Sequence, residues 1–192
     1  MDFAELFPVR IHNPETNQID WEIFAVAHVF HEDGFSNLEE LFVIHDEMYQ
    51  YWVSPSDDWI LHEQNDEYWI AVPRLHFPHA QIHSGTYRIV LIDSSGAQDE
   101  RDFFVAEVPP DDGLQPVLQV SDGSITVKSE HQEHRIAAYR AGGRHIATVD
   151  TQDSDISFES ITSERGEIHL HISSLEPYNG YLFRSGPYIV QR

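Results

Sequence analysis

The sequence is a succession of short stretches in which every second residue is apolar, and this two-residue period is the spacing of a β-strand with one buried face. The clearest example runs from Ile19 to Val29, where the odd-numbered residues are all apolar. From Phe24 onward the other face also becomes mostly apolar, which is typical of a central strand covered on both sides. The pattern therefore predicts a β-rich chain.

Two hairpins are predicted in the first half of the chain. In one, residues 42–45 pair with residues 48–52 across an Asp-Glu turn. In the other, the β-branched run 86–92 returns through 102–105 after the small polar residues 93–96. Small turn-forming residues between two such runs are the usual signal of a hairpin.

Further strands are expected at residues 59–61 and 68–72, the second closed by Pro73. Residues 37–45 also admit a helix, because Ser36 and Glu39 have the spacing of a capping box and apolar residues follow at helical intervals. The β-favouring Phe, Val and Ile at 42–44 favour the strand over this alternative.

The second half repeats the strand pattern with glycine and aspartate turns between the runs. The runs are 125–127, 136–139 and 145–149 around a glycine turn, 156–158, 168–172, and a final pair, 181–183 and 188–190, around residues 185–187. Short strands at such regular spacing predict a sandwich or barrel.

A proline-rich segment divides the chain. Residues 109–116 contain three prolines and interrupt the apolar pattern, so they are expected to form an extended linker. The predicted fold is all-β: two consecutive antiparallel β-sandwich domains, residues 1–108 and 117–192, joined by the Pro-rich linker 109–116.

Charge restricts the partners of such a chain. Its 33 Asp and Glu against 11 Lys and Arg give a formal net charge of −22, and residues 1–108 alone carry 21 acids against 4 bases. A surface of this sign repels nucleic acid and anionic membranes. We therefore expect a protein partner that binds chiefly to the first domain and whose complementary charge is basic, with no nucleic acid and no insertion into a membrane.

Cysteine is absent, which excludes disulfides, thiolate metal sites and iron–sulfur clusters. The acidic N-terminus lacks the features of a secretory signal, so the chain as written is expected to be cytoplasmic. A mature exported chain whose signal had been removed would look the same.

The segment from Gly85 to Gly96, followed by Phe103-Phe104-Val105, resembles the last two strands of bacterial immunoglobulin-like and fibronectin type III-like domains. In such domains a Gly-x-Tyr strand leads through an Asp-x-x-Gly turn to a final strand. The residues at 69–73 lie where the preceding strand would run. The resemblance implies a β-sandwich, and it implies binding or spacing only by analogy.

Two groups of residues are candidates for binding. Tyr49, Tyr51, Trp52 and Trp59 could form a protein-binding patch or stack on sugars, since large rigid rings give much contact area at little entropic cost. Alternation places Tyr49 and Tyr51 on one face and Trp52 on the other. The competing interpretation is that these rings fill a sandwich core.

Histidines suggest a second kind of site. His76, His79 and His83 supply the three imidazoles that a zinc, nickel or copper site would need, and His169 and His171 share one face of a predicted strand. Exposed loop histidines are the simpler interpretation of the first cluster.

The sequence contains no catalytic motif, such as a nucleophile elbow, a phosphate-binding glycine loop or a dinucleotide fingerprint. Our hypothesis is a non-enzymatic binding or structural module without a cofactor. The alternatives are a metal-binding protein that uses His76, His79 and His83, and a carbohydrate-binding module that uses exposed Tyr and Trp.

Overall fold

The computed structural model describes residues 1–29, 35–64, 67–76, 82–107, 115–121, 123–175 and 180–192. The fold is all-β, as predicted, and nearly all of the described strand pairs are antiparallel. The exception is a parallel pair between β1 (Phe3–Asn13) and β15 (Leu182–Gln191), in which Val9 lies opposite Leu182. The alternating pattern therefore predicts the strands correctly but does not predict this parallel pairing.

The chain divides into two compact units. Unit 1 comprises Met1–Pro8 and Glu22–Val108, and unit 2 comprises Val9–Trp21 and Pro109–Arg192. Strands β1 and β2 (Gln18–Val29) thus contribute residues to both units. The expected first domain, residues 1–108, differs from unit 1 by this inserted segment, residues 9–21.

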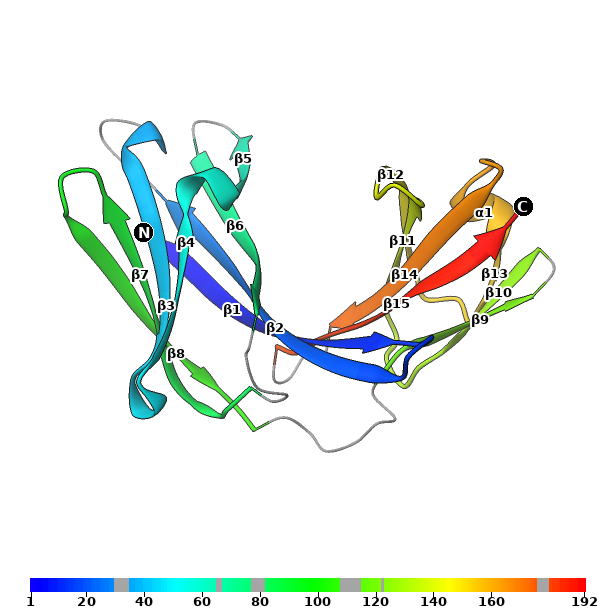
Figure 1. The fold of residues 1–192 in the computed structure, drawn as a ribbon, viewed down its shortest axis with the longest axis horizontal. Helices are drawn as coiled ribbons and strands as arrows, with labels where there is room; N and C mark the ends of the chain where they lie inside the picture. Colours follow the sequence, from blue (N-terminus) through cyan, green and yellow to red (C-terminus); the bar gives the residue numbers. More distant parts are fainter. Residues whose placement is uncertain (30–34, 65–66, 77–81, 108–114, 122, 176–179) are drawn as a thin grey trace. The chain divides into compact units, whose positions relative to one another are not determined.

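Unit 1 contains two sheets (Figure 1). In the first, β1 is followed by β2, β6 and β5, and in the second the order is β4, β3, β7, β8. The bounds are β3 (Leu38–His45), β4 (Gln50–Pro55), β5 (Ile60–Gln64), β6 (Glu67–His76), β7 (Gly85–Asp93) and β8 (Gln98–Val105), with short 3-10 helices η1 (Phe35–Asn37), η2 (Asp46–Met48) and η3 (Ser56–Asp58).

Alternation along these strands sorts the side chains as expected. On β2 the buried residues begin at Trp21 and recur at every second position to Val29. The segment at 38–45 is the strand β3, so the helical alternative over residues 37–45 is wrong, and only η1 before it is helical. Leu41 and Val43 on one face of β3 are fully buried, and the β7 residues opposite them, Leu91 and Ile89, are buried on the same face of the sheet.

Pro73 does not end its strand as predicted. β6 continues to His76, and the register between β2 and β6 shifts between Ile23 and Ala25. Ile23 lies opposite Leu75 and Ala25 opposite Val72, so two residues of β6 face one residue of β2. Such a bulge releases a position from the ladder, which is how a strand accommodates a proline that has no N–H to donate.

The hairpin of β7 and β8 is confirmed, and side-chain chemistry explains its turn. The Asp93 carboxylate accepts hydrogen bonds from the backbone N–H groups of Ser95 (2.8 Å) and Ala97 (2.9 Å). Gly96 follows with a φ of 81°, a conformation that costs glycine no steric strain.

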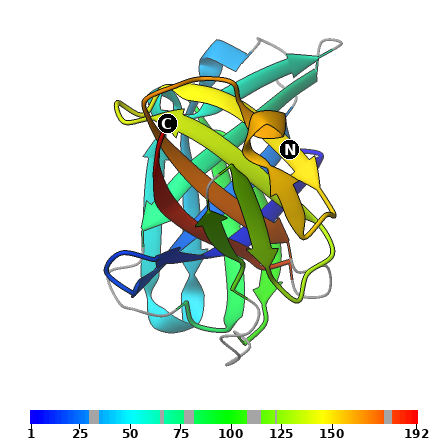
Figure 2. The ribbon, with the colours of Figure 1, turned by 90° about the vertical axis from the view of Figure 1, so that its right-hand side faces the viewer.

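In unit 2, one sheet has the order β2 (residues 18–21), β1 (residues 9–13), β15, β14, β11 and β12, and a second sheet has the order β13, β10, β9. Figure 2 faces this unit. The bounds are β9 (Val117–Ser121), β10 (Ser124–Lys128), β11 (His134–Arg140), β12 (His145–Thr151), β13 (Asp155–Ser157), α1 (Phe158–Ile161) and β14 (Glu167–Leu175).

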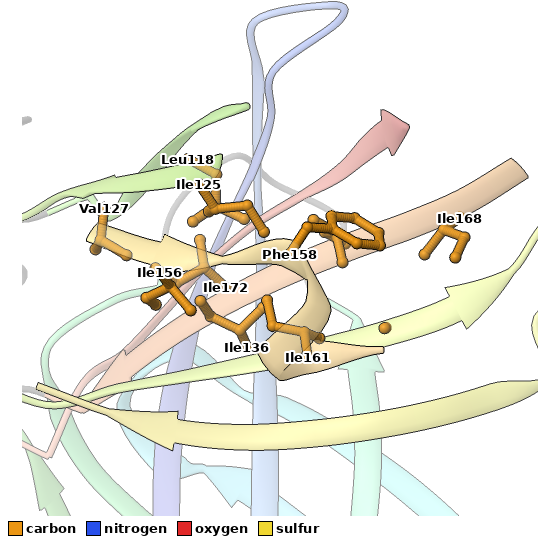
Figure 3. Close-up of a cluster of buried hydrophobic side chains, with 11 residues drawn as sticks. Leu118, Ile125, Val127, Ile136, Ile156, Phe158, Ile161, Ile168 and Ile172 are labelled. Atoms are coloured by element: carbon orange, nitrogen blue, oxygen red, sulfur yellow. The ribbon is translucent and has the colours of Figure 1, made fainter. Parts of the chain in front are cut away.

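The core of unit 2 lies between these two sheets. Side chains from both sheets and from α1 form one buried cluster (Figure 3). Its members are Leu118, Ile125, Val127, Ile136, Ala138, Ile156, Phe158, Ile161, Ile168, Leu170 and Ile172. Phe158 belongs to α1 and not to the strand predicted over 156–158, and the helix directs its ring and Ile161 into the same core.

One expectation for unit 2 is wrong. The residues 185–187 form no turn between two strands, because β15 runs unbroken through them and the register shifts opposite His171. Of the linker expected over 109–116, the described residues are Gln115 and Pro116, and both are buried. Residues 109–114 lie outside the described part of the chain.

Gln115 is held by a polar network inside unit 2. Its amide oxygen accepts a hydrogen bond from the Arg10 guanidinium (3.1 Å), and its amide nitrogen donates to the Arg184 carbonyl and the Ser185 hydroxyl, both at 2.8 Å. Buried polar groups need such partners, so these contacts fix residue 115 to β1 and β15.

Candidate interaction surface

The four aromatic residues proposed for binding have different environments. Tyr49 is 95% exposed and Tyr51 is 68% exposed, whereas Trp52 is half-buried on the inward side of β4. Trp59 is buried, and its indole N–H donates to the Ser54 carbonyl (3.2 Å) and hydroxyl (3.1 Å). Tyr49 and Tyr51 are therefore accessible to a partner, and Trp59 contributes to the packing of unit 1.

Tyr51 belongs to an apolar surface on the side of the β4-β3-β7-β8 sheet that faces away from the core of unit 1. Register places Tyr51 beside Ile44, and Val53 beside Phe42, which itself neighbours Val90. Tyr51 and Val53 are exposed, and Phe42 and Ile44 are half-buried. We call this the outer face and define it by Tyr51, Val53, Phe42, Ile44 and Ile92; Val90 lies on the same side of the sheet but is buried.

Acidic residues border the outer face. Glu40 lies opposite Pro55 and Ile92, and Glu100 and Asp102 on β8 lie opposite Val90 and Arg88. The η2 turn adds Asp46 and Glu47 at one end of β4, and η3 adds Asp57 and Asp58 at the other, all exposed.

Arg88 is the cation at this border. Its guanidinium donates to Asp46 (2.8 Å) and Glu100 (3.1 Å), and the hydrogen bond to Asp46 is the main cause that raises the pKa of Arg88. Its charge is thus already shared between two carboxylates, and the border as a whole remains acidic.

Sequence patterns predict Tyr51 as a candidate but miss Phe42, Ile44 and Val53. Residues 41–44 form a continuous apolar run, which usually indicates a strand covered on both faces. In the structure Leu41 and Val43 on one face of β3 are fully buried, whereas Phe42 and Ile44 on the other face are half-buried. Two solvent-side apolar residues within such a run are the signal of an open sheet face, but the run alone does not say which face is open.

The histidines proposed for metal binding are only partly described. His76 ends β6 and nothing is described of its side chain, and His79 lies outside the described residues. His83 is half-buried, and its backbone carbonyl accepts a hydrogen bond from the Tyr87 hydroxyl (2.9 Å). Within the described part of the chain, His, Asp and Glu nowhere gather in a group of three or more that could hold a metal ion.

His169 and His171 share one face of β14, as predicted. The His169 Nε2–H donates to the Glu167 carboxylate at 2.9 Å, and the ring of His171 packs edge-on against Tyr139, with centroids 5.5 Å apart. Burial, and secondarily the charge of Arg184, lower the pKa of His171 to about 4.

This pKa predicts acid sensitivity. In the unfolded chain His171 takes up a proton near pH 6.5, but in the folded chain only near pH 4, so stability is lost as the pH falls between these values. Because His171 is partly exposed to solvent, we expect the free energy of unfolding to fall by only about 2 kcal/mol over this range. Urea unfolding followed by circular dichroism should show that H171Q loses less stability over this pH range than the wild type. The control H145Q should lose as much stability as the wild type. Equal pH dependence in H171Q and the wild type would contradict the assignment.

Comparisons with known proteins find similar chains among solved structures. No protein-family model and no curated protein matches its sequence. Among solved structures it is similar to Tp47, the 47-kilodalton lipoprotein of Treponema pallidum, with 11% identity and a TM-score of 0.48 over 96% of this chain and 49% of that one. The chain thus spans about half the length of Tp47.

Two other similar structures are more distant. PorU from Porphyromonas gingivalis is 12% identical with a TM-score of 0.33, covering 98% of this chain and 20% of its own. Murine CEACAM1b is 14% identical with a TM-score of 0.25, covering 98% and 100%. Similarities this low assign no function to the chain. No helix in the described residues is long and apolar enough to cross a membrane.

Proposed function

We propose that this chain is a non-enzymatic interaction module of the immunoglobulin-like or fibronectin type III-like kind, and that it binds a protein partner through the outer face of unit 1. The observation that carries the proposal is the open apolar surface around Tyr51, Val53, Phe42 and Ile44. Contiguous apolar surface that is rimmed by polar groups is typical of protein-binding sites.

The immunoglobulin-like character is supported by Tyr87. Its side chain is fully buried at the start of β7, and its hydroxyl donates to a backbone carbonyl four residues upstream, at His83. This is the geometry of the tyrosine corner of immunoglobulin-like sandwiches. Sandwiches of this kind commonly present a sheet face or loop ends to partners.

The rigidity of the surface also favours binding. β3 is a central strand, paired with β4 on one side and with β7 on the other, so the apolar side chains project from a continuous ladder. A surface that is ordered before binding loses little conformational entropy when a partner docks.

Site-specific photo-cross-linking tests this proposal. The full chain would carry benzoylphenylalanine in place of Tyr51, or in place of Leu175 as a control, which is exposed in unit 2. We expect a discrete cross-linked protein at position 51 that is absent at position 175. The same products at both positions, or none at position 51, would exclude the outer face as the binding surface.

A further inference from the structure

The strand β4 joins two acidic turns, and this arrangement carries information about the partner. η2 brings Asp46 and Glu47 to the start of the strand, and η3 brings Asp57 and Asp58 to its end. A six-residue strand is roughly 20 Å long. Negative charge is therefore present at both ends of a strand whose exposed side chains, Tyr51 and Val53, are apolar.

These charges are mostly uncompensated. Asp46 is paired with Arg88. Glu47, Asp57 and Asp58 are exposed, and the described part of the chain gives none of them an ion pair. Glu40, directly opposite Pro55, adds a further exposed carboxylate on the outer face at the η3 end.

The sequence within β4 differs from that of most other edge strands. The residues Gln50 to Pro55 include none that is charged, whereas β5, β8, β12 and β13 each contain acidic residues. Edge strands usually carry such charges, which discourage other chains from docking. Of the described edge strands, β9 is likewise uncharged. β4 is thus apolar in its middle, and the acidic residues lie beyond its ends.

We propose that the partner presents an extended segment with apolar residues in its middle and Lys or Arg near both ends, and that this segment lies along β4. The inference rests on the proposed function and adds the chemistry of the partner. The apolar residues would cover Tyr51 and Val53, and the basic residues would reach the acids of η2 and η3.

Charge argues against a second copy of this chain as the occupant. Residues 1–108 hold 21 acids and 4 bases, so two outer faces brought together would place acidic borders against each other. Like charges placed opposite each other at an interface are strongly unfavourable. A basic partner instead gains at both ends of the strand and is steered toward the site by the same field.

A peptide library tests the inference with the full-length chain. Immobilised octapeptides would have alternating aliphatic or aromatic residues in the middle and Lys, Ser or Glu at both ends, together with a set in which the middle is Ser and Thr. Many sequences of each class are used, so that no single peptide decides the result. The readout is the fluorescence of labelled full-length chain retained by each class.

We expect the class with apolar centres and Lys ends to be retained most strongly. Raising the salt from about 0.05 M to about 0.5 M should weaken this class about tenfold, because screening shortens the range of the attraction. Peptides with Ser ends should show little salt dependence. Retention of polar-centred Lys peptides at the same level would indicate non-specific charge attraction and would overturn the inference.

Matched variants locate the contact. The triple variant E47Q/D57N/D58N should lose the preference for Lys ends and keep the weak retention of apolar peptides. The control E130Q/D153N removes two exposed acids from unit 2 and should behave as wild type. Thermal unfolding of each variant verifies that the fold is retained.

The outcomes separate the inference from the proposed function. Equal retention of apolar peptides with Lys, Ser and Glu ends would overturn the basic character of the partner and leave the outer face as a binding surface. If apolar peptides are not retained by the wild type and position 51 gives no cross-link, both proposals fail.

Discussion

A fragment comprising residues 109–192 is expected to remain unfolded, although the proline-rich segment at its start, residues 109–116, has the composition of a domain boundary. Unit 2 also contains Val9–Trp21, which the fragment lacks. Without this segment, β15 loses the parallel neighbour that pairs Val9 with Leu182 and His12 with Ser185. An edge-exposed, apolar β15 would also make the fragment prone to aggregate.

The missing side chains set the size of the effect. Val9 and Trp21 are buried, and the Trp21 ring packs edge-on against the buried ring of Tyr181, at 6.3 Å between centroids. Loss of these two buried side chains costs about 5 kcal/mol. Removal of Arg10 also leaves the buried amide oxygen of Gln115 without its donor. The sum is comparable to the whole stability of a small domain, about 5–15 kcal/mol.

Complementation provides the control. Residues 1–108 expressed separately and mixed with 109–192 supply the missing segment, and they should restore dispersed amide resonances and a cooperative thermal transition. The measurement is the two-dimensional NMR spectrum of labelled 109–192 with and without its complement. A well-dispersed spectrum of the fragment alone would show that residues 9–21 are dispensable for unit 2.

Strand positions are encoded by neighbouring residues, whereas the pairing of distant strands is not. Strand positions are predictable because alternation is a property of neighbouring residues, as in β2, where burial recurs at every second position. The parallel pairing of β1 with β15 joins residues more than 170 positions apart, and no local pattern encodes it. Pro73, Gly186 and Pro187 favour turns when only their neighbours in the sequence are considered. In the structure, bulges in paired strands accommodate them.

The candidate surface, like the fold, is predictable from the sequence only in part. Tyr49 and Tyr51 are exposed, as the binding interpretation requires, whereas Trp59, named as a candidate for the same reason, is buried, as the core interpretation requires. The difference arises from Ser54, whose carbonyl and hydroxyl accept the Trp59 N–H across η3. The proximity of these two residues depends on the chain reversal at η3, which their residue types do not specify.

Substitution of Gly186 by alanine is expected to destabilise unit 2 by about 3 kcal/mol, which is large for the addition of one methyl group. Gly186 lies in the bulge of β15 opposite His171 and has a φ of 139°, a region that residues with a side chain rarely adopt. A Cβ there would lie 2.8 Å from the Leu170 carbonyl oxygen and 2.8 Å from His171 Nδ1. The carbonyl belongs to the ladder of β14 and cannot move without disturbing its pairing.

Gly142 provides the matched control for this substitution. It lies in the β11–β12 turn, and an added Cβ would meet no atom within 4 Å. Chemical unfolding of the full chain, followed by circular dichroism, should therefore show G142A within about 0.5 kcal/mol of wild type and G186A far below it. Because β15 pairs with both β14 and β1, the loss in G186A should extend to the strand segment at residues 9–13, with faster amide exchange at Ile11. Equal stability of the two variants would mean that the bulge relaxes freely, and that the close approach of β15 to His171 does not constrain the sheet.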